Sequence, residues 1–343
     1  MSKLGRLAFW GALLLGLFGN TAVAQELQIA RLGDFKLESG EVLRDCQIGY
    51  RTFGTLNEAK SNAILFPSWA GGISEQTASN IGPGKLVDST KYYVIAVDAL
   101  SNGVSSSPST SKSQPRMSFP KITIRDMVGT QHELLTRVLH LSHLKAVLGV
   151  SMGGMQTFQW MVSYPDFMDI AIPIVGSPRL APYDLLLWQA QVDAIVHDSA
   201  WNNGNYTANP DRTSDAEFSA LFLTTPGHYN ENTTRADVFA QLEKAEAGRV
   251  PDANDKIRQS QAMMALDVSK TFDGSMERAA SVVKARVFVI VAKRDHVVTP
   301  VPALEFAKLL HAQVLELEGD CGHQAPGCES SIVNPAVAAF LEH

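Results

Sequence analysis

Residues 145–154 have the sequence KAVLGVSMGG. The apolar residues at its start predict a buried strand, and residues 155–161 continue as a helical run. A serine in such a strand-to-helix turn is held in a strained conformation with its hydroxyl projecting, and flanking glycines avoid collisions with neighbouring backbone. This context predicts that Ser151 is a nucleophile. The alternative is a glycine-rich turn in which Ser151 only caps the helix.

A serine nucleophile needs a base, and the base needs an acid that orients it. On folds with this turn, the chain order is serine, then an acid, then histidine. Asp295 follows a later apolar strand, and His323 lies in the loop after the next one. We therefore predict that Ser151, Asp295 and His323 form a catalytic triad. His296 is the alternative base and Asp320 the alternative acid.

Acyl transfer also needs N–H donors for the oxyanion. These are usually the amide after the nucleophile and one from a loop after an earlier strand. Met152 supplies the first. The apolar run at 63–66 leads into the loop 68–72, with sequence SWAGG, where we favour the backbone of Ala70 over that of Trp69. Trp69 is alternatively a wall of the substrate pocket.

The rest of the chain alternates short apolar runs with amphipathic stretches, which predicts an α/β fold with a mostly parallel sheet. The amphipathic stretches at 126–141 and 301–310 are the clearest helices, and 25–54 resembles β-hairpins with turns at Gly33-Asp34 and Ser39-Gly40. The expected buried strands are 63–66, 92–97, 146–150, 170–175, 287–291 and 314–317.

The alternation stops between about residues 177 and 275, where helical pieces but no clear buried strand occur. We therefore predict a core in two parts, 25–177 and 276–343, with a helical cap inserted at 178–275. Aromatic and methionine residues in the cap favour an apolar pocket, although such residues more often serve packing. They are Trp188, Trp201, Phe222, Met263 and Met264.

The first 24 residues have the features of a cleavable signal peptide. Lys3 and Arg6 precede an apolar run at 7–19, and Ala22 and Ala24 give a small-x-small ending. Thirteen apolar residues are fewer than the roughly 20 that span a bilayer. We expect a periplasmic or secreted protein without a stable membrane anchor after cleavage.

Export affects the interpretation of the three cysteines. Cys321 and Cys328 flank a short loop with Gly and Pro, and we expect a disulfide between them, with two unpaired thiols as the alternative. Cys46 stands alone, and we expect it to be a buried free thiol. The cysteines lack metal-finger spacing, and Lys85 lacks the context of a phosphate-binding loop. We therefore expect neither a metal nor a cofactor.

The chain of 343 residues is 45% hydrophobic and 19% charged, as in ordinary globular proteins. Its formal net charge is −6 and no run of basic residues occurs, so we exclude nucleic acid as a partner. The expected partner is a small-molecule acyl ester. A monomer and an oligomer are both compatible with the sequence.

Four stretches resemble the homoserine O-acetyltransferase branch of the α/β-hydrolase superfamily: residues 81–85, 88–95, 149–160 and 164–166. The resemblance covers most of the chain after the signal peptide. It implies an α/β-hydrolase fold and a ping-pong reaction in which serine takes an acyl group and passes it to an alcohol or to water. It also assigns Ser151, Asp295 and His323 to the triad, and Met152 and Ala70 to the oxyanion hole.

The chain departs from that branch where the acceptor binds. Those transferases typically carry His-Ala-Leu-Thr-Gly at the position of the loop 68–72, and a Tyr-Leu-Ser-Glu stretch in the cap that is absent here. An exported enzyme would also meet no acetyl-coenzyme A. We therefore predict a serine hydrolase that cleaves acyl esters or amides. The alternatives are an O-acyltransferase and a non-catalytic binding protein on a hydrolase scaffold.

Overall fold

The computed structural model describes residues 26–210, 213–246 and 250–342, so the predicted signal peptide lies outside the described residues. Eight strands form one sheet in the order β1-β2-β4-β3-β5-β6-β7-β8. β2 is antiparallel to β1 and β4, and the remaining neighbours are parallel. The predicted α/β class is confirmed. The strands are β1 (Gln28–Lys36), β2 (Val42–Phe53), β3 (Ala63–Pro67), β4 (Tyr93–Val97), β5 (Leu144–Val150), β6 (Met168–Ile174), β7 (Arg286–Ala292) and β8 (Gln313–Leu317).

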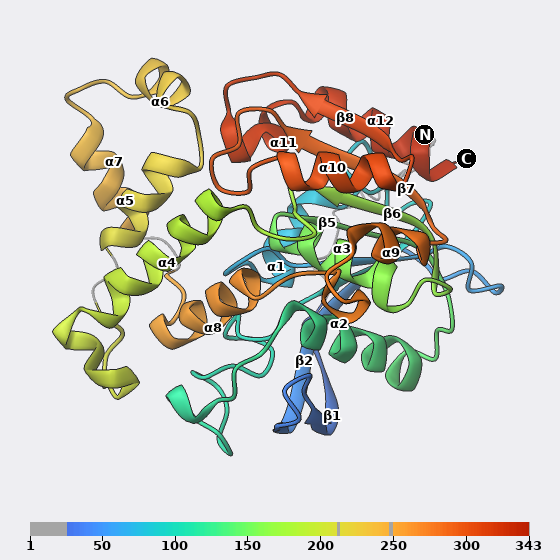
Figure 1. Ribbon diagram of the computed structural model, residues 1–343, viewed down its shortest axis with the longest axis horizontal. Coiled ribbons are helices and arrows are strands. Elements are labelled where there is room, and N and C mark those ends of the chain that lie inside the picture. Colours follow the sequence, from blue (N-terminus) through green and yellow to red (C-terminus); the bar gives the residue numbers. More distant parts are fainter. Residues whose placement is uncertain (1–25, 211–212, 247–249, 343) are drawn as a thin grey trace, which may run out of the picture.

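Helices cover both faces of the sheet, as Figure 1 shows. Those outside the cap segment, which is our name for residues 178–275, are α1 (Ser74–Thr77), η1 (Ala78–Asn80), η2 (Arg116–Ser118), α2 (Ile124–Glu133), η3 (Leu134–Val138), α3 (Met152–Ser163), α9 (Met276–Ser281), α10 (Val301–Leu309), η6 (Gly322–Gln324), α11 (Ala325–Cys328) and α12 (Ser330–Glu342). α2, α3 and α10 pack on one face, and α12 packs on the other. The central strands are therefore buried on both sides, which explains their nearly continuous apolar sequence.

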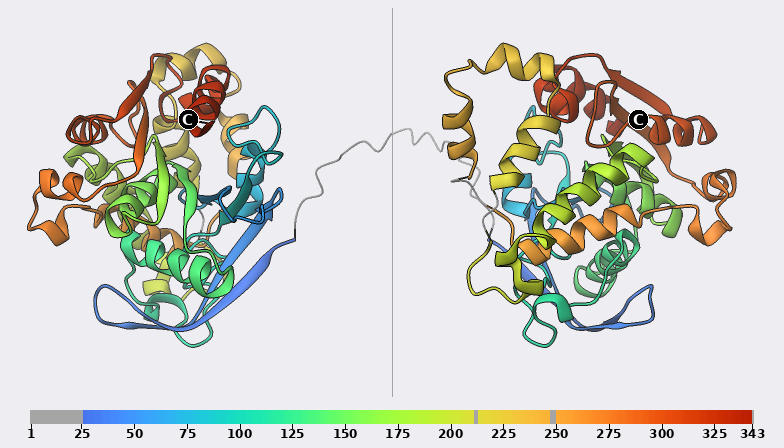
Figure 2. Two further views of the ribbon diagram at one scale, coloured as in Figure 1. Left: turned by 90° about the vertical axis from the view of Figure 1, so that its right-hand side faces the viewer. Right: turned by 60° about the vertical axis from the view of Figure 1, so that its left-hand side comes forward.

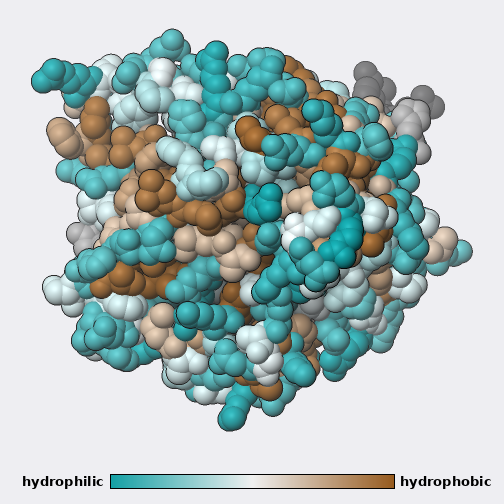
Figure 3. All heavy atoms as spheres, viewed as in Figure 1, coloured by the Kyte–Doolittle hydropathy of each residue, from teal (hydrophilic) through white to brown (hydrophobic). Residues whose placement is uncertain are grey.

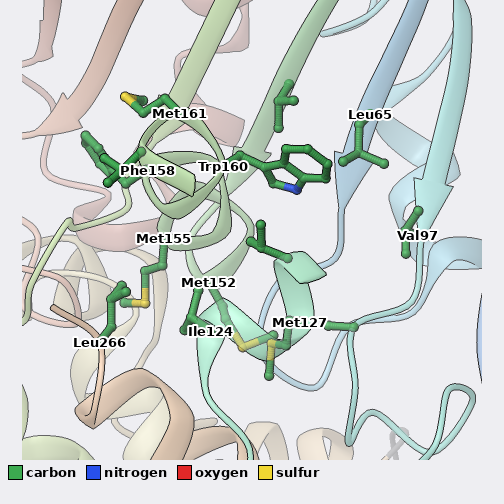
Figure 4. Packing of buried hydrophobic residues seen from close by; sticks show 14 of the residues in the cluster. Leu65, Val97, Ile124, Met127, Met152, Met155, Phe158, Trp160, Met161 and Leu266 are labelled. Atoms are coloured by element: carbon green, nitrogen blue, oxygen red, sulfur yellow. The ribbon is translucent and has the colours of Figure 1, made fainter. Parts of the chain in front are cut away.

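The larger core cluster lies between the sheet and α3. Figure 4 shows Met155 and Trp160 of α3 together with Leu65 of β3, Val97 of β4 and Leu266 of the cap segment. All five side chains are buried. Because the cluster includes Leu266 of the cap segment, the packing around α3 depends on both the core and the cap segment.

The predicted turn at Gly33-Asp34 is wrong. The chain stays in β1 through these residues, and the pairing with β2 shifts register on both sides of Gly33. This irregularity is a β-bulge, which glycine with φ of 78° accommodates without a side-chain clash. Only the turn near Ser39-Gly40 joins two strands, so the N-terminal region is one long hairpin.

The helix predicted at 126–141 is also shorter than expected. α2 begins at Ile124 because Thr123 and Asp126 cap it reciprocally: Thr123 Oγ1 accepts the Asp126 N–H at 3.1 Å, and the Asp126 carboxylate accepts the Thr123 N–H at 2.9 Å. After Glu133 the chain continues as the π-helical turn η3. The helix predicted at 301–310 is present as α10.

The helices of the cap segment are joined by loops, and the segment lies on the left in Figure 1. Its described residues form no strand and only one isolated bridge, between Arg179 and Asp267. Its helices are α4 (Pro182–Val196), η4 (Ser199–Gly204), α5 (Thr213–Phe222), α6 (Pro226–Asn232), α7 (Val238–Glu246), α8 (Ala253–Met264) and η5 (Lys270–Phe272).

Several apolar side chains of the cap segment face solvent. The largest exposed fractions are 69% for Leu186, 64% for Leu221 and 75% for Phe239, on α4, α5 and α7. Figure 3 shows brown surface on the same side of the molecule. Among the described residues, no helix has both the length and the apolar character that crossing a membrane requires.

Candidate active site

Ser151 occupies the sharp turn between β5 and α3, with φ of 59° and ψ of −121°. The backbone packs so closely here that a Cβ at Gly149 would lie 2.3 Å from the carbonyl carbon of Gly153. A Cβ at Gly153 would lie 2.5 Å from the carbonyl oxygen of Pro67. These distances explain the two glycines, and the positive φ of Ser151 marks the same turn as strained. The Ser151 hydroxyl makes no capping hydrogen bond to α3, which contradicts the capping alternative.

The structure brings together the three residues assigned to the triad. His323 Nε2 lies 2.8 Å from Ser151 Oγ, and His323 Nδ1 lies 2.7 Å from Asp295 Oδ2. All three side chains are buried. A carboxylate facing Nδ1 suits the tautomer of His323 that donates through Nδ1, in which Nε2 accepts a hydrogen bond from the Ser151 hydroxyl. This is the arrangement that a hydroxyl needs to become a nucleophile.

Asp295 is held in place by its second oxygen. Oδ1 accepts the backbone N–H groups of Val297 at 2.8 Å and Val298 at 3.0 Å. The carboxylate is therefore oriented before it meets the imidazole. The loop that follows β7 thus supplies both the acid and the amides that orient it.

The alternative base and acid lie elsewhere. His296 makes no hydrogen bond to any residue in the described part of the chain, although it is adjacent to Asp295. Asp320 Oδ1 lies 3.3 Å from His228 Nδ1 and faces the cap segment. Neither residue replaces Asp295 or His323 in the chain of hydrogen bonds to Ser151.

The loop 68–72 borders the site, and both Trp69 and Ala70 line the cavity that contains Ser151. Within the described residues, the N–H groups of Trp69 and Ala70 have no hydrogen-bond partner. Met152 is the first residue of α3, so its N–H has no intrahelical acceptor. The Gly71 N–H, by contrast, donates to Gln259 Oε1 at 2.7 Å and is not available to an oxyanion. The backbone N–H groups of Met152, Ala70 and Trp69 are therefore available to an oxyanion.

Gln259 of α8 was not anticipated from the sequence. Its Nε2 donates to the Leu100 carbonyl at 3.0 Å, so one buried amide connects the cap segment to two loops of the core. From α3, Gln156 Nε2 donates to the Ser68 carbonyl at 3.0 Å. A glutamine within a helix has no local sequence signature for such a role. The loop 68–72 is therefore bonded both to the cap segment, through Gln259, and to α3, through Gln156.

A second contact between the cap segment and the core lies beside the acid. The Asp184 carboxylate of α4 accepts the backbone N–H and the hydroxyl of Thr299, each at 3.1 Å. Burial raises the pKa of Asp184, although the hydrogen bonds from Thr299 act in the opposite direction. This contact fixes α4 against the loop that follows Asp295.

The cavity at Ser151 has a volume of about 790 Å³ and is lined by residues of the core and of the cap segment. Three of the five aromatic and methionine residues singled out in the cap line it: Trp188, Phe222 and Met263. Trp201 instead donates to Asn254 Oδ1 at 2.7 Å, and Met264 packs within the hydrophobic clusters. The cavity suits a small organic substrate with apolar parts.

The cysteines are arranged as expected. Cys321 and Cys328 form a disulfide that encloses the segment carrying His323. Cys46 is free and buried. Burial raises the pKa of its thiol to about 12, and a hydrogen bond with Ser106 only partly opposes this.

Comparisons with known proteins show which family the fold belongs to. Residues 64–326 match the model of the alpha/beta hydrolase fold family. A protein of Corynebacterium glutamicum named "Probable esterase" is 31% identical over 296 residues, which cover 81% of this chain and 83% of that protein. The acetyl esterase MekB superposes with a TM-score of 0.87 at 27% identity, covering 93% of this chain and 98% of MekB. The homoserine O-acetyltransferase of Bacillus anthracis superposes with a TM-score of 0.83 at 26% identity, covering 93% and 98% of the two chains.

Proposed function

The chain belongs to the alpha/beta hydrolase fold family, and on this premise we propose that it is an exported serine esterase that cleaves short-chain acyl esters. That it is an enzyme of the hydrolase or acyltransferase kind follows from its relatives. The observation that supports a serine esterase is the hydrogen-bonded series Asp295–His323–Ser151. Ser151 and His323 of this series line the cavity.

In the first half of the reaction, Ser151 Oγ attacks the ester carbonyl carbon while His323 Nε2 takes the hydroxyl proton. Asp295 stabilises the imidazolium that forms. The N–H groups of Met152 and Ala70 donate to the oxyanion. Collapse of the tetrahedral intermediate breaks the bond to the alcohol, which leaves with the proton from His323, and the acyl group remains on Ser151.

In the second half, water attacks the acyl-enzyme. His323 takes a proton from the water, a second tetrahedral intermediate forms on the same donors, and its collapse breaks the bond to Ser151 Oγ. The serine recovers its proton from His323, and the carboxylic acid leaves. The alcohol, the acid and one consumed water account for all atoms.

Two observations support water over an alcohol as the acceptor. The loop 68–72 differs from the His-Ala-Leu-Thr-Gly of the transferases, and the cap segment lacks their Tyr-Leu-Ser-Glu stretch. The name of the structural relative MekB, an acetyl esterase, supports a short acyl group. Export is supported by the basic start, apolar run and small-x-small ending of residues 1–24.

The experiment measures product release by the purified protein from a graded series of esters, acetyl to octanoyl, with and without an added alcohol acceptor. We expect the fastest turnover on the shortest acyl groups and the free acid as product. Ser151→Ala should lower the rate by about 10⁴-fold or more, because triad members act as a unit. Ser281→Ala, at an exposed serine of α9, is the matched control.

The outcomes separate the alternatives. Acyl transfer to the added alcohol in place of water would indicate an O-acyltransferase. Turnover that survives Ser151→Ala would refute the mechanism, and binding of esters without turnover would indicate a binding protein. N-terminal sequencing of protein from a cell fractionation tests export, for which we expect a chain that begins at Gln25 outside the cytoplasm.

A further inference from the structure

His228, on the cap helix α6, lies against the disulfide that encloses His323. Cys321 Sγ is 3.5 Å from His228 Nδ1 and 3.6 Å from its Nε2. One imidazole nitrogen and the two sulfurs all lie within 4.8 Å of one another. The right-hand view of Figure 2 shows the yellow helices of the cap segment beside the red C-terminal segment that contains α11. Nothing in the proposed reaction uses this cluster.

We propose that, once the disulfide is reduced, this cluster binds a thiophilic divalent cation such as Zn²⁺ through Cys321 Sγ, Cys328 Sγ and His228 Nε2. Two thiolates and an imidazole are the ligand types that zinc prefers, and water completes a tetrahedral set. The Cα atoms of the two cysteines are 6.6 Å apart, so side-chain rotation alone can move the sulfurs onto one ion.

Asp320 supplies the outer contact that a zinc-binding histidine needs. Its Oδ1 lies 3.3 Å from His228 Nδ1, so the Nδ1–H group donates to the carboxylate and the lone pair of Nε2 remains free. Such a carboxylate fixes the tautomer and ring orientation of the ligand and makes it more basic. The sequence analysis considered Asp320 only as an alternative acid for catalysis.

The backbone already holds the two sides of the site together. The Thr225 N–H donates to the Asp320 carbonyl, and the Gln324 N–H donates to the Leu223 carbonyl, each at 3.3 Å. Gly322 also packs against residue 224, because a Cβ there would lie 3.1 Å from the Cα of Thr224. His228 is therefore placed beside the sulfurs without help from a metal, which lowers the ordering cost of binding.

The chemistry is a two-electron reduction followed by ligand exchange. An external dithiol or phosphine supplies two electrons, the S–S bond breaks, and each sulfur takes a proton. The cation then displaces both thiol protons to solvent, since only thiolates bind it. The loop that carries His323 thus has two interchangeable restraints: a covalent bond under oxidising conditions, and a metal–thiolate link that also includes the cap segment under reducing ones.

The test titrates the purified full chain with Co²⁺, before and after reduction with a phosphine that is then removed without oxygen. We expect one Co²⁺ per reduced chain, with thiolate-to-cobalt charge-transfer absorption that Zn²⁺ abolishes by displacement, and none in the oxidised protein. Zn²⁺ should also raise the Tm of the reduced protein and leave that of the oxidised protein unchanged.

Variants assign the ligands. Cys328→Ser should remove the charge-transfer absorption, and His228→Ala and Asp320→Asn should each weaken binding by about tenfold or more. His197→Ala, at an exposed histidine of the cap segment, and Cys46→Ala should bind as the wild type does. Absence of Co²⁺ binding by the reduced wild type would overturn the proposal. So would unchanged binding by His228→Ala, or lost binding by Cys46→Ala. None of these results depends on esterase activity.

Discussion

The backbone N–H of Gly71 donates to the side-chain oxygen of Gln259, a residue 188 positions further along the chain, at a distance of 2.7 Å. Gly71 follows Ala70 in the loop 68–72, and Gln259 lies in helix α8 of the cap segment. A cap residue that is distant in sequence and lines the cavity of Ser151 therefore positions the loop that we propose as the source of an oxyanion donor. Gln259 is a positioning residue in this sense.

Replacement of Gln259 should affect kcat more than KM. Gln259→Leu removes the hydrogen bond between Gln259 Oε1 and the Gly71 N–H and so loosens the loop, and a displacement of about 1 Å at a reacting centre can cost roughly 100-fold in rate. We expect kcat to fall about 10- to 100-fold with KM nearly unchanged. Gln259→Glu keeps an acceptor for Gly71 and should recover part of the loss. Steady-state kinetics on an acetyl ester checks this, with Gln189→Leu on α4 as control.

Asp295→Asn should lower kcat by about 10⁴-fold without unfolding the protein. The asparagine oxygen can still accept from Val297 and Val298, but its NH₂ group then faces His323 Nδ1 and favours the wrong tautomer. Asp320→Asn provides the comparison, since Asp320 contacts His228 and not the base. Equal losses in the two variants would contradict the assignment of the acid. Circular dichroism and thermal unfolding check that both remain folded.

Gly153→Ala should destabilise the protein and inactivate it. The new methyl group would lie 2.5 Å from the Pro67 carbonyl oxygen, which is backbone and cannot move aside alone. Overpacking of this kind costs about 1–3 kcal/mol of unfolding free energy. Gly327→Ala is the control, because its Cβ would meet no atom within 4 Å. Urea unfolding measures both, and equal stability of the two variants would refute this account of the turn.

The buried thiol of Cys46 should make the protein sensitive to alkali. Its pKa is raised from 9.0 to about 12 in the native state, so between these values the native protein holds a proton that the unfolded chain releases. Stability is therefore fully present below about pH 9 and falls as pH rises, by up to about 1.4 kcal/mol per pH unit. Urea unfolding of wild type and Cys46→Ala at pH 8 and pH 10.5 measures this. We expect a steeper loss in the wild type, and parallel losses would contradict it.

The core of the fold and the sharp turn at Ser151 could be predicted because their causes are local. Strands buried on both faces require continuous apolar runs, and the turn at Ser151 requires glycines at fixed positions. Chain order then pointed to Asp295 and His323, which the structure brings within hydrogen-bond distance of one another. The prediction at Gly33 was wrong because a bulge and a turn can both require a glycine with positive φ, so the sequence alone does not distinguish them.

Contacts between distant segments could not be predicted, because no local sequence pattern indicates them. Gln259, Asp184 and His228 are ordinary helix residues, and their partners lie in core loops that come close only in the folded chain. Which side chain of a helix reaches a loop depends on how the cap segment sits on the core. That placement results from packing over the whole interface, which no local pattern encodes.

The cap segment contacts every part of the proposed machinery: Gln259 at the loop 68–72, Asp184 beside the proposed acid, and Leu223 at the loop of the proposed base. Helices α8 and α4 carry the first two of these contacts, respectively. Evolutionary divergence of substrate preference among relatives with this architecture should therefore be unevenly distributed. It can accumulate in α5 to α7 at little cost, whereas exchanging α4 or α8 between relatives should disturb catalysis together with selectivity.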